Sequence, residues 1–119
     1  MKRSLKSLSF LALLAGFAGI ASAADVQGIL IDKMCSTKAV KGGQAAAVAH
    51  DRDCALMPPC QQSGYGVYTA DNKYLTFDDA GNTKAIAALK KSKKKDDLKV
   101  TVTGDVQGDT IKVANLKLM

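Results

Sequence analysis

The chain has 119 residues, a formal net charge of +6 and 5% aromatic residues. This length accommodates one small domain and excludes a multidomain protein. Three basic residues (Lys2, Arg3, Lys6) lie at the extreme N-terminus, so the rest carries only about +3. With so few aromatic side chains to stack on bases, we do not expect nucleic acid as a partner.

Residues 1–23 have the pattern of a secretory signal peptide. A basic start is followed by an apolar run at 8–20 and by the small residues Ala21, Ser22 and Ala23. The run is shorter than the ~20 residues that a membrane-spanning helix requires, and no later segment is apolar for as long. We therefore expect no transmembrane span, and a single domain at 24–119 that is periplasmic or secreted.

The first half of that domain is predicted to contain one strand and one helix. Residues 25–33 form a β-branched, apolar run that favours a strand. Residues 36–43 have no periodicity and end in two glycines, which is typical of a loop. Residues 44–57 are rich in alanine and are followed by Pro58 and Pro59, a pattern that predicts a helix stopped by the prolines.

The second half is predicted to be mostly β. Residues 67–77 form a hairpin around Asp71 and Asn72, which tolerate the positive φ of a tight turn. Thr83 is the expected N-cap of a helix running to about residue 92, and the lysines at 90–95 complement its dipole. Residues 98–106 and 111–118 form the last two strands around a turn at 108–109, with a bulge near Ala114 and Asn115.

The resulting order is strand, long insert, strand, strand, helix, strand, strand. It predicts a mainly β fold, an OB-like five-stranded barrel with one helix between strands 3 and 4. A Cys-rich helical insert, at about 34–66, lies between strands 1 and 2. An α+β sheet of another topology has the same element order and is the alternative.

The insert gathers all three cysteines and the only histidine. On the predicted helix His50, Cys54 and Met57 are spaced i, i+4 and i+7 and share one face. Thiolate, imidazole and thioether ligands suit Zn²⁺ or Cu(I). We therefore predict a soft-metal site whose ligands are Cys35, His50, Cys54 and Cys60, with Met57 or Met34 as additional ligands.

A disulfide is the alternative use of the same cysteines. Cys35 paired with Cys54 or Cys60 would staple the insert to the barrel and stabilise the fold by about 3 kcal/mol. The odd cysteine would stay free or link two chains, so the protein would be a monomer or a disulfide-linked dimer. Its function would then be to bind an unidentified periplasmic partner or a small ligand, without a metal.

We expect no enzymatic activity. A Cys nucleophile with His50 as its base is conceivable, but the chain has one histidine and no Cys-x2-Cys redox pair. The spacing Cys-x2-Cys-His of haem attachment is missing too. The predicted function is therefore binding of a metal ion, not catalysis.

Several motifs together resemble a group of small exported bacterial proteins of unassigned function. They are Met34-Cys35, His-x3-Cys-x5-Cys at 50–60, Ser-Gly-Tyr-Gly at 63–66 and the paired segments 100–104 and 108–111. The resemblance implies that the Cys/His insert and the barrel-like C-terminal part belong together, and it brings no activity with it. Residues 74–81 and the final hairpin are also similar to bacterial exported OB-fold proteins.

Overall fold

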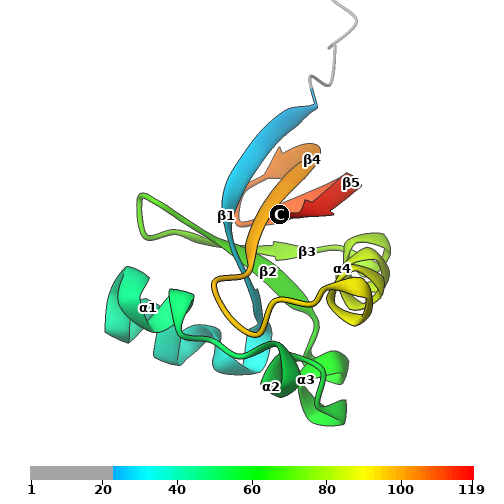
Figure 1. Cartoon of the computed structure of the whole chain (residues 1–119). Coiled ribbons are helices and arrows are strands. Elements are labelled where there is room, and N and C mark those ends of the chain that lie inside the picture. The colour runs from blue at the N-terminus through cyan, green and yellow to red at the C-terminus, as the bar shows by residue number, and fades with distance from the viewer. Residues whose placement is uncertain (1–22) are drawn as a thin grey trace, which may run out of the picture.

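A computed structural model describes residues 23–119, so the predicted signal peptide lies outside the described residues except for Ala23. Five strands close into a barrel in the order β1-β2-β3-β5-β4; three of the four helices gather at one end of it and the fourth packs beside the strands (Figure 1). The predicted OB-like barrel, mainly β with α elements, is confirmed. The strands are β1 (Ala24–Asp32), β2 (Tyr65–Thr69), β3 (Tyr74–Phe77), β4 (Lys99–Gln107) and β5 (Thr110–Leu118).

Strand β1 connects the two sides of the barrel. Its first residues pair antiparallel with β4 and its last ones with β2, and Gly28 pairs with both Val100 and Thr69. A Cβ on Gly28 would lie 2.3 Å from the carbonyl oxygen of Tyr68, so only glycine fits where the neighbouring strands converge. Beyond this point β1 packs against the insert and ends at Asp32. The parallel pairing of β3 with β5 closes the barrel.

The barrel interior is filled by aliphatic side chains from the strands and from helix α4 (Asp79–Lys91), which packs against β5. Complete burial of one such side chain, for example Leu89, contributes about 1.5–3 kcal/mol. The fully buried aliphatic members are Leu30, Val67, Leu89, Leu98, Val100, Val102 and Ile111.

A second apolar cluster holds the insert against the outside of the barrel. Ile29 and Ile31 point away from the interior that Leu30 fills, and they pack with Ala39 and Ala47 of helix α1 (Lys33–Val48). Both faces of β1 are therefore buried here. This explains why the strand reads as a continuous apolar run rather than an alternating one.

The helical boundaries of the insert differ from the prediction. Residues 36–42 are helical within α1 rather than a loop, and the helix predicted at 44–57 ends at Val48. Helix α1 is kinked at Gly43, whose φ is 72°. After α1 ends, two short helices follow, α2 (Arg52–Ala55) and α3 (Pro58–Ser63). The alanine run at 45–47 is helical as expected, but Asp51 caps a new helix, so the first helix ends well before the prolines. His50, Cys54 and Met57 therefore do not share one helical face.

The second half follows the prediction more closely. The hairpin turns at Asn72, whose φ is 62°. The register shift between Thr103 and Gly104 leaves Ala114 unpaired, which is the predicted bulge. Helix α4 begins earlier than predicted, because Asp78 is its N-cap rather than Thr83. None of the helices formed by residues 23–119 is long and apolar enough to cross a membrane.

The N-cap residue Asp78 gives a direct test of how α4 is joined to the barrel. Asp78 Oδ1 accepts hydrogen bonds from the backbone N–H groups of Gly81 and Val113, at 3.0 and 3.2 Å, and so joins α4 to β5. We expect Asp78→Ala to lower the free energy of unfolding by about 1–2 kcal/mol. The matched control Thr83→Ala removes an exposed hydroxyl and should change it by less than about 0.5 kcal/mol. Urea unfolding followed by circular dichroism measures both, and equal losses would contradict the assignment.

Candidate metal centre

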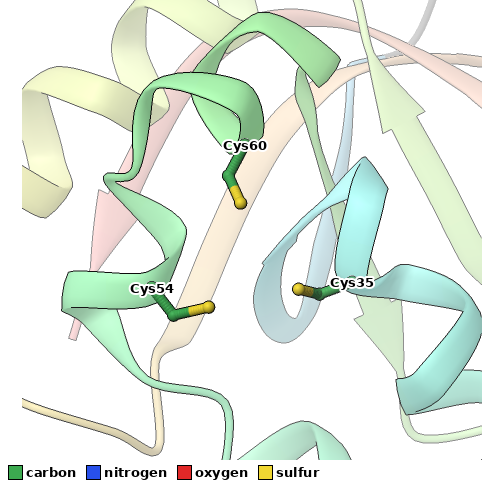
Figure 2. A group of neighbouring side chains, drawn as sticks. All are labelled: Cys35, Cys54 and Cys60. Atoms are coloured by element: carbon green, nitrogen blue, oxygen red, sulfur yellow. The ribbon is translucent and has the colours of Figure 1, made fainter.

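Three cysteines from three different helices converge at one end of the barrel. Figure 2 shows the side chains of Cys35, Cys54 and Cys60 directed toward a common centre. Their sulfur atoms all lie within 4.8 Å of one another. A tetrahedral zinc ion with Zn–S bonds of about 2.3 Å holds its sulfurs about 3.8 Å apart. Small side-chain rotations are therefore enough to bring all three sulfurs onto one ion.

Cys35 is positioned by the junction between β1 and α1. Asp32, the last residue of β1, is the N-cap of α1, and its Oδ2 accepts a hydrogen bond from the Cys35 backbone N–H at 3.0 Å. The cap fixes the first turn of the helix directly after the strand. Cys35 is thereby held in that first turn, at the end of β1.

Cys60 is brought close by the return of the chain through α3. Pro58 occupies the first turn of α3, where a proline costs no hydrogen bond. The far end of α3 is tied to the start of α1, because Lys33 N–H donates to the Gly64 carbonyl at 2.8 Å and Met34 N–H to Ser63 Oγ at 3.2 Å. These bonds place α3, and with it Cys60, beside the first turn of α1.

Cys54 is held by α2, which is anchored on two sides. The buried Tyr65 hydroxyl donates to the Ala55 carbonyl at 2.6 Å and links α2 to the barrel. Arg52 N–H donates to the Lys95 carbonyl at 2.7 Å and links α2 to the segment before β4. Burial raises the pKa of Tyr65 to about 12, so its hydroxyl stays a neutral donor at physiological pH.

Asp32 and His50 form a second group of possible ligands together with Cys35. The Asp32 side chain has no exposed surface, and its Oδ1 lies 2.7 Å from His50 Nε2. One ligand atom from each of Asp32, Cys35 and His50 lies within 4.8 Å of the others, so Cys35 belongs to this group and to the group of three sulfurs. The sequence analysis did not identify Asp32. The feature of the sequence that could have pointed to Asp32 is an acidic residue at the end of an apolar strand, directly before Lys33-Met34-Cys35.

Asp32 is ionised in the folded protein. Burial alone would raise its pKa, but the hydrogen bonds with His50 and with the Cys35 backbone N–H lower it below the ordinary value of 3.8. A carboxylate only accepts hydrogen bonds, so His50 Nε2 carries the proton of the shared bond. The other ring nitrogen, Nδ1, is the one left for coordination.

The thiols of Cys35 and Cys60 resist ionisation when no metal is bound. Burial, followed by the nearby Asp32 carboxylate and Cys54, raises the pKa of Cys35 to about 12. Burial and Asp32 raise the pKa of Cys60 in the same way. Thiolates packed this closely beside a buried carboxylate repel one another. A metal cation bound between the sulfurs would lower the pKa values of the thiols, since a coordinated thiol loses its proton.

The structure brings four of the five predicted site residues into one region: Cys35, His50, Cys54 and Cys60. All three cysteines are free thiols. The fifth, Met57, is the N-cap residue of α3 and is 52% exposed, and Met34 is similarly exposed beside Cys35. The thiols and the imidazole thus lie in one region, in two groups that share Cys35, and the thioethers lie at the protein surface.

An open cleft of about 400 Å³ leads from solvent to this centre. Cys35, Cys54 and His50 face it, whereas Cys60 is 4% exposed and is not part of its wall. The lining residues are Cys35, Lys38, Ala39, Ala46, Ala49, His50, Asp51 and Cys54.

No family model, curated protein or solved structure matches the chain. What the centre can do is therefore argued from its own geometry.

The Asp32 hydrogen bonds predict an acid-sensitive stability. Because folding lowers the Asp32 pKa, the stabilisation is complete above its unfolded value near 3.8 and is lost as the pH falls below that value. Asp32→Asn should therefore remove part of the stability at neutral pH, and its difference from the wild type should shrink toward pH 2.5. Urea unfolding with chelator present measures this difference at each pH.

The control for this experiment is Asp71→Asn, at an exposed carboxylate whose pKa is also lowered, by the Thr69 hydroxyl. This variant should still lose the stabilisation by Asp32 as the pH falls. A wild-type advantage over Asp32→Asn that stays constant from pH 7 to 2.5 would show that the Asp32 charge does not stabilise the fold.

Proposed function

We propose that this protein is exported and binds one soft metal ion, Zn²⁺ or Cu(I), through the thiolates of Cys35, Cys54 and Cys60. The observation that supports this most is the convergence of three sulfur atoms, within 4.8 Å of one another, from three separately anchored helices. Thiolates are the ligands that select these ions. Each sulfur is held by hydrogen bonds of its own helix, so the group is assembled without the ion.

His50 is the fourth donor in this proposal. Its Nε2–H is bound to the buried Asp32 carboxylate, which leaves Nδ1 for the metal. A histidine ligand whose second nitrogen donates to a carboxylate is the usual arrangement in metal sites, because the carboxylate fixes the ring and raises its basicity. Three thiolates and one imidazole make a Cys₃His set, one of the common structural zinc sites.

The properties of the thiols favour binding over catalysis. A cysteine nucleophile needs a lowered pKa, so that the thiolate is present at neutral pH. Cys35 and Cys60 have raised pKa values instead, because they are buried and face Asp32. We therefore propose a non-enzymatic role for the protein, in holding or sensing a metal ion outside the cytoplasm.

The same proximity supports one competing function, a disulfide-stapled binding module without a metal. Sulfurs within 4.8 Å need only a modest movement to form a bond of about 2.05 Å. A disulfide would use two of the three thiolate ligands, so the two functions exclude each other in a single molecule.

Intact mass spectrometry of protein purified without chelator separates the two functions. We expect a metal-sized increment in the native spectrum that disappears on denaturation, together with three alkylatable thiols. A mass two hydrogens below that of the reduced chain, with no metal increment, would contradict metal binding and support the stapled module.

Substitutions in the centre should weaken zinc binding in a graded way. We expect Asp32→Asn to reduce the affinity by about 10–100-fold, the cost typical of an outer-shell partner, and Cys60→Ser to reduce it further because a ligand is lost. The matched control is Ser36→Ala, next to Cys35, whose hydroxyl bonds only the Lys33 carbonyl. Competition titration against a chromophoric chelator measures each affinity, and a Cys60→Ser variant that binds as tightly as the control would contradict the ligand set.

A further inference from the structure

We infer that the cleft beside the centre admits a small thiol carrying a carboxylate group, and that this molecule exchanges the bound ion by taking the coordination position of His50. The inference rests on the proposed function and names the chemical class of its exchange partner. Three features of the cleft support it: its walls, the donor atoms that face it and its one unpaired cation.

Three of the residues that line the cleft are alanines, and the lining comes from both sides of the break in α1. Lys38 and Ala39 precede the break at Gly43, and Ala46 and Ala49 follow it. Alanine leaves space that a longer side chain would fill. The resulting volume of about 400 Å³ lies within the range of about 300–1,000 Å³ usual for small-molecule sites.

The donor atoms face the cleft unequally. Cys35, Cys54 and His50 line it, whereas Cys60 is buried away from it. An entering molecule therefore reaches the ion on the side of Cys35, Cys54 and His50, and of these three His50 is the one donor that binds without a negative charge. A thiol is the appropriate entering group, since these ions prefer sulfur ligands.

Lys38 supplies the preference for a carboxylate. It is exposed at the cleft, and no carboxylate of the described residues lies within 4.0 Å of its ammonium group. The other charged lining residue, Asp51, accepts a hydrogen bond from the Asp53 N–H at 2.6 Å as the cap of α2. Lys38 is thus the one positive charge in the lining that an anionic ligand would meet.

The exchange step balances without a redox partner. The entering thiol releases its proton to solvent and its sulfur bonds to the metal, while the bond between the metal and His50 Nδ1 breaks. His50 is released from the metal and keeps its Nε2–H bond to Asp32. When the ion leaves on further thiol molecules, Cys35, Cys54 and Cys60 take up protons from water.

The test compares two thiols that differ in one carboxylate, N-acetylcysteine and N-acetylcysteamine, as agents that remove zinc from the zinc-loaded protein. We expect N-acetylcysteine to act several-fold faster on the wild type. Lys38→Gln should abolish that preference, and the matched control Lys41→Gln, on the same helix but outside the cleft, should keep it.

Filling the cleft should slow removal by both thiols several-fold without changing the equilibrium zinc affinity. Ala46→Leu does this, and Ala49→Leu provides a second variant should the first one fold poorly. The control is Ala45→Leu, at an exposed position outside the lining. Rates that are the same in all variants, at unchanged zinc affinity, would overturn the inference and leave the proposed function standing. A protein that takes up no zinc would overturn both.

Discussion

The buried Asp32 carboxylate is the group on which the candidate centre depends. It has no exposed surface, it caps α1 at the Cys35 N–H and it holds His50 at 2.7 Å. A charge at such depth requires these partners, because an unpaired buried carboxylate would be strongly destabilising. One side chain thus sets where α1 begins, how the imidazole is oriented and how much negative charge the thiols face.

The barrel provides the rigid frame for this arrangement. Both faces of β1 are buried, with Leu30 inside the barrel and Ile31 against α1, so the strand that ends in Asp32 has little freedom to move. Helices α2 and α3 are too short to be stable alone. They are held by hydrogen bonds to the barrel and to its loops, such as that from the Tyr65 hydroxyl to Ala55. The stability of the fold therefore positions the sulfur atoms before any ion arrives.

The sequence was sufficient for the barrel and for the grouping of the three cysteines with His50, but not for the path of the insert. Alternation and turn residues correctly predicted the hairpin at Asn72 and the bulge at Ala114, since these depend on local chemistry. The helix expected at 44–57 was wrong at both ends, because the packing of Ala39 with β1 and the Asp51 cap of α2 are set by the tertiary structure. Asp32 was missed for the same reason. Its role appears only when β1 and α1 are joined without a loop.

The measurement that tests the central claim most directly is X-ray absorption spectroscopy at the zinc edge of the loaded protein, because it counts the ligands of the ion. The account predicts three sulfur atoms at about 2.3 Å and one nitrogen at about 2.0 Å. A shell of nitrogen and oxygen atoms alone, or one with a single sulfur, would contradict it. In that case Cys35, Cys54 and Cys60 would not form a common metal site.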